Sequence, residues 1–392
     1  MTTRDPTKSK TAPGLAMAVI VVAELFGTSL WLSTNAVADA LHAAWGMTTA
    51  QLGHLTSAVQ LGFIAGTFLF AFSGLADRFS ASRIFAVCAL AGAAANGAFV
   101  ILADGLAPGL VLRFATGVAL AGVYPVGMKL VVSWAPQRAG NVLGWLVGML
   151  VVGTGLPHFI RGIEATPGWE GVVLAASALA ATAAAMVWWL GDGPHHARGG
   201  RLQWGGVLDV FRLPRFRAAA LGYFGHMWEL YAFYAVVPLL IAQWGAGHDA
   251  GDIYLIASGV FLAGGIGCVL GGSVSHHWGS ARVAIIALAG SALMCLSYPV
   301  AQGMPHDVVL VLLLAWGFFV VADSPQFSAL AAGACPPERV GSALAMMNSI
   351  GFAVTIVAIE LVTSVWGGTG ARVGWLLLPG PLLGLLAMRR LW

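Results

Sequence analysis

The feature that most constrains this chain is its series of apolar stretches, each of which has the length of a membrane-crossing helix. Twelve such stretches follow one another, at residues 14–37, 52–75, 84–102, 109–134, 142–163, 171–190, 218–241, 253–274, 283–302, 308–332, 342–364 and 374–388. A transmembrane helix needs about 20 apolar residues, whereas a transmembrane strand needs about half that number and alternates apolar with polar side chains. These stretches are long and do not alternate. They predict an all-α polytopic membrane protein with twelve transmembrane helices in a lipid bilayer.

The scarcity of charged side chains excludes a soluble fold. Charged residues make up 9% of the chain and hydrophobic residues 59%, whereas soluble domains carry about 25% charged residues. The net charge of +3 is small, and we expect no nucleic-acid partner. The four cysteines form neither a CxxC pair nor a cluster with histidine, so we expect no metal site, no disulfide framework and no cofactor.

The distribution of positive side chains predicts the orientation in the membrane. If both termini lie on one side, the loops of that side hold most of the arginines and lysines, whereas the opposite loops hold mainly acidic residues such as Asp39, Asp104 and Asp252. Loops rich in Lys and Arg remain on the cytoplasmic side. We therefore expect both termini in the cytoplasm, an even number of crossings and a location in the cell (inner) membrane.

The chain consists of two related halves. A charged loop at residues 74–83 has a weaker copy at 271–282, and Tyr124-Pro125 in the fourth stretch corresponds to Ser324-Pro325 in the tenth. We expect a six-helix bundle at residues 1–190, a hydrophilic cytoplasmic linker at 191–217 and a second, pseudo-symmetric six-helix bundle at 218–392. Duplicated halves with interrupted helices indicate alternating access around a site near the middle of the bilayer.

The loop after the second stretch carries a motif. Leu75-Ala76-Asp77-Arg78, with Arg83 beyond, resembles the loop motif of the major facilitator superfamily. The resemblance covers the whole chain and implies two six-helix bundles that transport a solute. It also implies that Asp77, Arg78 and Arg83 help to hold the halves closed at the cytoplasmic face. We expect Arg138 to take part in the same gate.

A second motif lies in the fourth stretch. Arg113-Phe114-Ala115-Thr116-Gly117 resembles the Arg-x-x-x-Gly motif of that family, which implies a role for Arg113 in proton coupling. The loop motif departs from the family pattern, because Ser80 stands in place of a glycine and Ala81 and Ser82 stand in place of basic residues. These departures affect the gate and leave the assignment to the superfamily intact.

Ionisable residues inside the stretches are the candidates for transport chemistry, because each costs about 2.5–3.5 kcal/mol at the bilayer centre. Glu24 lies near the middle of the first stretch, where burial favours the protonated carboxyl and suits reversible proton binding; the alternative is a structural carboxyl. Arg113 couples protons or contacts substrate, or else reaches the headgroups. Asp323 precedes Pro325, which removes a backbone donor, so Asp323 is a candidate ion or substrate site.

The seventh stretch places polar groups on one helix face. His226 and Glu229 are three residues apart and share that face, which Tyr223 extends with an aromatic ring. The pair senses protons, since histidine titrates near neutrality, or it fixes helix packing. We expect proton coupling from Glu24, Arg113, Asp323 and Glu229, and substrate contacts from Arg113, His226, Tyr223, Tyr124 and Asp323. Residues near the ends of stretches are weaker candidates: Lys129, His158, Arg161 and Glu360.

Motifs of other function classes are missing. No GxxxxGK[ST] loop is present to bind ATP, and neither HExxH nor GxSxG indicates an enzyme. A channel would need rings of identical polar groups, which the halves do not offer. We therefore predict a monomeric, proton-linked secondary transporter of a small solute. Two versions remain open: symport of an organic anion attracted by Arg113, and multidrug or metabolite efflux by antiport, with Glu24 accepting a lipophilic cation.

Overall fold

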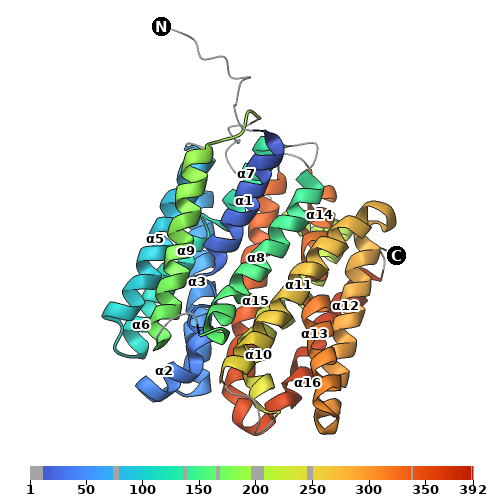
Figure 1. Ribbon diagram of the computed structural model, residues 1–392. Helices are drawn as coiled ribbons and strands as arrows, with labels where there is room; N and C mark the ends of the chain where they lie inside the picture. The colour runs from blue at the N-terminus through green and yellow to red at the C-terminus, as the bar shows by residue number, and fades with distance from the viewer. Residues whose placement is uncertain are drawn as a thin grey trace.

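The computed structural model describes residues 12–73, 79–135, 139–164, 168–195, 207–244, 250–336, 339–389 and 391. These residues form a bundle of helices, and no strand occurs within them (Figure 1). The helices of the first half are α1 (Pro13–Thr28), η1 (Asn35–Val37), α2 (Ala38–Trp45), α3 (Thr49–Ser73), α5 (Ala81–Leu102), α6 (Leu106–Leu120), α7 (Tyr124–Trp134), α8 (Ala139–Gly162) and α9 (Gly168–Leu190).

The second half of the chain begins after the short helix η3 (Val207–Arg212). Its helices are α10 (Pro214–Ala242), α11 (Ala250–Trp278), α12 (Ser280–Ser297), η4 (Val300–Gly303), α13 (His306–Ala322), α14 (Ser324–Gly333), α15 (Val340–Thr369), η6 (Gly370–Arg372), α16 (Val373–Leu377) and α17 (Pro379–Met388). Helix α10 begins before the expected boundary at residue 218, because Pro214 occupies the first turn, where its missing N–H costs no hydrogen bond.

The number of membrane crossings agrees with the sequence. Ten helical stretches are long and apolar enough to span a bilayer, and α1 is a shorter apolar helix. One of the ten stretches, Val340–Met388, contains both α15 and the α16–α17 pair. Counting that stretch as two crossings and adding α1 gives twelve. The prediction of an all-α polytopic membrane protein is confirmed.

One helix in each half is interrupted at the corresponding place. Helix α6 ends at Leu120 and α7 begins at Tyr124, with Pro125 in its first turn. Helix α13 ends at Ala322 and α14 begins at Ser324, with Pro325 in its first turn. Proline cannot donate the backbone hydrogen bond that a continuous helix needs, and therefore each helix breaks just before it. The two breaks place unusual backbone in the interior of the molecule.

Two pairs of helices join the halves: α8 packs along α11, and α3 packs against α15. Figure 1 shows α8 and α11 side by side at the centre of the bundle. Glycines allow this close approach, since a Cβ atom on Gly148 would lie 2.9 Å from the carbonyl oxygen of Gly265, and the reverse holds for Gly265. Small residues at such contacts let helix backbones pack directly in a membrane.

The molecule has two distinct ends. Helices α2 and α16 lie at one end, which we call the α2 face, and α1 begins at the other end (Figure 1). That opposite end also holds the start of the linker and the start of α10, and we call it the linker face. At the linker face the backbone N–H of His195 donates to the carbonyl oxygen of Ser133, so the described start of the linker packs on the end of α7.

Candidate functional site

A small cavity lies between the halves at the level of the two helix breaks. Its volume is about 40 Å³, which is room for about one water molecule. Both halves contribute to its wall: Tyr124, Val147, Leu150, Val151, Thr154, Tyr223, Met227, Leu230, Tyr231, Tyr234, Val321, Ser324, Ser328, Asn348 and Phe352. We call it the central cavity. In this conformation the two halves close around it.

Aromatic rings and neutral donors dominate the wall of the central cavity. Four tyrosines line it, namely Tyr124 from the first half and Tyr223, Tyr231 and Tyr234 from α10. The hydroxyl of Tyr234 is buried and has no hydrogen-bond partner among the described residues. None of the described side chains that line the cavity is charged. Such a wall can hold a flat ring and offer hydrogen bonds to an acceptor on it.

A stack of four rings closes the cavity toward the α2 face. Trp31 lies 5.5 Å from Tyr231 and 5.8 Å from Phe352, and Phe63 lies 4.5 Å from Phe352, measured between ring centroids. Trp31 and Phe63 come from the first half, whereas the other two rings come from the second half. Tyr231 lines the central cavity, and Ala235, one turn further along α10, lines a separate pocket at the α2 face. The ring stack therefore separates the two spaces.

A buried histidine–aspartate pair lies beside the central cavity. Nδ1 of His226 is 2.9 Å from Oδ1 of Asp323, and each side chain is 1% exposed. The distance is that of an ion pair, although the angles fall short of a hydrogen bond. His226 is one helix turn from Tyr223, and Asp323 directly precedes Ser324, so both adjoin residues of the wall. The structure thus brings together four of the residues expected to contact substrate, namely Tyr124, Tyr223, His226 and Asp323.

Glu229 lies on the same helix but away from the cavity. Its Oε1 accepts hydrogen bonds from Ser291 Oγ at 2.5 Å, Trp316 Nε1 at 2.5 Å and Cys295 Sγ at 3.1 Å. These donors come from α12 and α13, and the carboxyl therefore connects three helices of the second half. Glu229 is not among the residues that line the central cavity. Its contacts are those of a structural cross-link.

Glu24 is a buried carboxyl in the first half. It is fully buried in α1, and neither carboxyl oxygen has a hydrogen-bond partner among the described residues. The side chain faces α7, since a Cβ atom on Gly127 would meet Oε2. An unpaired charge is very costly at such a place. Glu24 does not line the central cavity.

Arg113 binds the protein itself. The fully buried guanidinium donates to the carbonyl oxygens of Leu30 at 3.0 Å and Trp31 at 2.6 Å, and to Ser33 Oγ at 3.0 Å and Asn96 Oδ1 at 2.7 Å. The carbonyl groups past the end of a helix lack intrahelical partners, and Arg113 supplies donors to two of them. Arg113 does not line the central cavity. It holds the backbone of Trp31, which belongs to the ring stack.

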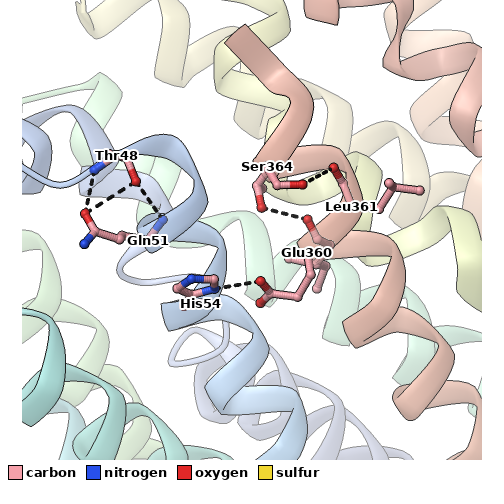
Figure 2. Close-up of polar contacts among 8 residues, drawn as sticks. Thr48, Gln51, His54, Glu360, Leu361 and Ser364 are labelled. Atoms are coloured by element: carbon pink, nitrogen blue, oxygen red, sulfur yellow. Dashed lines mark hydrogen bonds and ion pairs between the residues drawn. The ribbon is translucent and has the colours of Figure 1, made fainter. Parts of the chain in front are cut away.

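Polar contacts cross between the halves at the α2 face. His54 Nδ1 of α3 lies 2.6 Å from Glu360 Oε2 of α15, and Figure 2 shows the two side chains meeting across the gap between these helices. Tyr254 of α11 donates to Asp39 Oδ1 at 2.6 Å. Arg161 lies 3.4 Å from Asp39 Oδ2 within the first half, and its guanidinium lies 5.9 Å from the centroid of the Tyr254 ring of the second half. Two residues that the sequence marks as weak candidates, Arg161 and Glu360, therefore belong to contacts that close this face.

The same face contains a pocket of about 320 Å³ between the halves. Asn35 lies at its inner end, where its Nδ2 donates to the carbonyl oxygen of Ala235 at 2.9 Å. His158 Nε2 lies 2.9 Å from Asn35 Oδ1. Asn35 therefore links α8 of the first half to α10 of the second half. Neutral polar residues such as Asn35 carry no distinctive sequence signal, and sequence reasoning missed it, together with Trp31, Phe63 and Phe352.

The expected gate at the linker face falls largely outside the described residues, because Asp77, Arg78 and Arg138 belong to segments that the structure does not describe. Arg83 is described and lies exposed near the start of α5. Next to it, the backbone N–H of Ser82 donates to Asp192 Oδ1 at 2.8 Å. The start of α5 is therefore joined to the start of the linker.

The sequence of this chain matches a known protein family. The sequence profile of the Major Facilitator Superfamily matches residues 17–359 of this chain. The crystal structure of a D-xylose-proton symporter matches with a TM-score of 0.74 and 15% identity, and the match covers 97% of this chain and 98% of that chain. At that identity the likeness shows the fold alone.

Three relatives are transporters by name. NiaP of Bacillus subtilis (strain 168), named for niacin/nicotinamide, is 29% identical over 145 residues, and the niacin transporter NiaP of Acinetobacter baylyi (strain ATCC 33305 / BD413 / ADP1) is 33% identical over 144 residues. Each alignment covers 34% of this chain, and they cover 34% and 31% of those relatives. A gallate transporter of Pseudomonas putida is 24% identical over 361 residues, which cover 80% of this chain and 77% of that protein.

Proposed function

This chain belongs to the major facilitator superfamily and is an integral membrane transporter rather than an enzyme, and on that premise we propose that it carries a small aromatic carboxylate together with a proton. The observation that carries the proposal is the central cavity, whose wall is built from both halves and, among the described residues, contains four tyrosines and no charged side chain. A substrate held there touches both halves at once, as alternating access requires.

The wall matches the two chemical parts of an aromatic acid. Tyr124, Tyr223 and Tyr231 bring aromatic rings to the wall, against which a flat substrate can pack. Tyr234 carries a buried hydroxyl that has no partner among the described residues, and Asn348 adds an amide; both can donate to a carboxylate oxygen. Niacin and gallic acid, after which three relatives are named, are both aromatic carboxylic acids.

The lack of charge among the described side chains of the wall supports proton coupling. A carboxylate in a buried cavity without a cation is strongly disfavoured. Its charge is neutralised most simply by one proton, held either on the substrate or on His226 beside Asp323. Substrate and proton then cross together without net charge. Glu24, fully buried in the first half, is an alternative carrier of the same single proton.

The contacts at the α2 face fit a closed outer gate. The His54–Glu360 pair and the Tyr254–Asp39 hydrogen bond both join the halves there, and we place this face outside the cell (inner) membrane, with both termini in the cytoplasm. A six-helix bundle on each side of the linker then rocks about the glycine contact between α8 and α11. Asp77, Arg78, Arg83 and Arg138 close the opposite, cytoplasmic gate in the other state.

The test is uptake of radiolabelled niacin and gallate into proteoliposomes that contain the full-length protein, with nicotinamide as the uncharged counterpart. We expect an inward proton gradient to drive accumulation of a carboxylate and not of nicotinamide, without a response to membrane potential. Tyr234→Phe should raise KM, whereas Tyr298→Phe, which alters a tyrosine outside the cavity wall, should leave KM unchanged. Uptake that ignores the proton gradient, or that prefers nicotinamide, would refute the proposal.

Export of lipophilic cations is the second candidate, and the buried, unpartnered Glu24 is the observation that favours it. It requires Glu24 to meet the cation, yet Glu24 lies against α7 and does not line the central cavity. In the same proteoliposomes, cation efflux that is abolished by Glu24→Gln and unaffected by Tyr234→Phe would establish this second function in place of the first.

A further inference from the structure

A larger pocket lies on the side of the second half, between α10, α15 and α17, and is separate from the central cavity. Its volume is about 740 Å³. Apolar side chains form most of its wall, including Leu221, Phe224, Trp228, Leu383 and Leu386. Leu383 is 63% exposed and Leu386 is 56% exposed, so the pocket opens toward the surrounding lipid. We call it the lateral groove.

Three arginines surround the end of the lateral groove at the linker face. Arg215 and Arg217 lie in the first turn of α10, and Arg389 directly follows α17. All three are exposed, and none forms an ion pair with another described residue. The nearby Arg212 differs, because it pairs with Asp209 at 2.9 Å. The groove thus combines an apolar wall with uncompensated positive charge at one end.

The length of the lateral groove matches one leaflet of a bilayer. Its wall runs along α10 from Arg215 to Trp228, which is about 20 Å at the rise of an α-helix. One leaflet, including its headgroup region, is also about 20 Å thick. At the deep end Trp228 is fixed by a hydrogen bond from Nε1 to the carbonyl oxygen of Leu376 at 3.0 Å, and Pro379 closes the groove where α16 gives way to α17.

We propose that the lateral groove is a binding site for an anionic phospholipid of the leaflet at the linker face. The phosphate lies among Arg215, Arg217 and Arg389, and an acyl chain lies along Leu221 and Leu383. Basic pockets between transmembrane helices recognise anionic headgroups in this way, and a zwitterionic lipid would leave the excess positive charge uncompensated. Because α10 also carries three of the four tyrosines of the central cavity, and His226 beside it, the lipid contacts a helix that contributes to the substrate site. The inference does not depend on which solute is carried.

The experiment is native mass spectrometry of the full-length protein in detergent with phosphatidylglycerol or phosphatidylcholine. We expect preferential retention of phosphatidylglycerol. Arg217→Gln and Arg389→Gln should each weaken its binding about fivefold, the factor that corresponds to about 1 kcal/mol per arginine near an anionic headgroup. Arg282→Gln is the matched control, because it removes an exposed arginine at the same face outside the groove, and it should leave binding unchanged.

A second variant tests the apolar wall. Ala387→Trp places a large ring in the groove and should displace the retained lipid whatever its headgroup, while gel filtration reports that the protein remains folded. If phosphatidylglycerol and phosphatidylcholine bind equally, or if Arg282→Gln weakens binding as much as Arg217→Gln does, the groove is not an anionic lipid site. Retained lipid in Ala387→Trp would equally overturn the proposed location.

Discussion

Replacing Arg113 by glutamine separates a structural role from substrate contact. The wild-type guanidinium donates to the carbonyl oxygens of Leu30 and Trp31 in a fully buried setting. Hydrogen bonds to a charged group contribute about 1.5–3 kcal/mol each. Glutamine is shorter and reaches neither carbonyl group, and the loss of both bonds should lower the free energy of unfolding by about 3–6 kcal/mol.

That loss is large for a protein whose total stability is of order 5–15 kcal/mol. The assay is unfolding in mixed micelles by titrated SDS, followed by tryptophan fluorescence. Arg161→Gln is the matched control, because Arg161 forms a partly exposed pair with Asp39 at 3.4 Å and such pairs contribute about 0–1 kcal/mol. Arg113→Lys keeps the charge and should recover part of the stability.

The Arg113→Gln variant also tests whether Arg113 contacts the substrate. Arg113→Gln should lower niacin or gallate binding only in proportion to the fraction of protein that unfolds, because Arg113 does not line the central cavity. If the variant unfolds as the wild type does and yet fails to bind substrate, then Arg113 contacts substrate, and the position of the site argued above is wrong.

Three further outcomes follow from the contacts described. Asp323→Asn should abolish accumulation driven by a pH gradient, because His226 loses its acidic partner, and should retain substrate exchange at equal pH. Loss of both activities would argue against a coupling role for Asp323. Gly148→Val should slow substrate exchange at least about tenfold and preserve binding. The Cβ atom of the valine would lie 2.9 Å from the carbonyl oxygen of Gly265 and hinder movement at this helix contact. Unchanged exchange would exclude this contact as the pivot. His54→Gln removes a half-exposed pair that contributes about 0–1 kcal/mol to the closed α2 face. Labelling of a cysteine placed at Thr56, in the α2-face pocket, should therefore rise by up to about fivefold. Equal labelling would show that the pair does not hold the gate closed.

The sequence by itself determined that the chain lies in a lipid bilayer, how many times it crosses that bilayer, and where the two matched helix breaks lie. These properties depend on local composition, because an apolar run of about 20 residues must cross a bilayer and a proline lacks the backbone donor of a continuous helix. The matched prolines Pro125 and Pro325 marked the breaks before α7 and α14, whereas Pro157 and Pro238 lie inside the continuous helices α8 and α10. The division into two halves with a linker also came from the sequence and remains a prediction.

Only the tertiary structure decided which polar groups meet. His226 and Glu229 share a helix and are three residues apart, yet one lies against Asp323 beside the cavity, while the other is bonded to Ser291 and Trp316 away from it. Arg113 likewise turned out to bind backbone carbonyl groups. A helix that is apolar all round carries no pattern that tells how it is rotated about its axis. Its rotation, and with it the side chains that face the cavity, is set by packing against helices distant in the sequence.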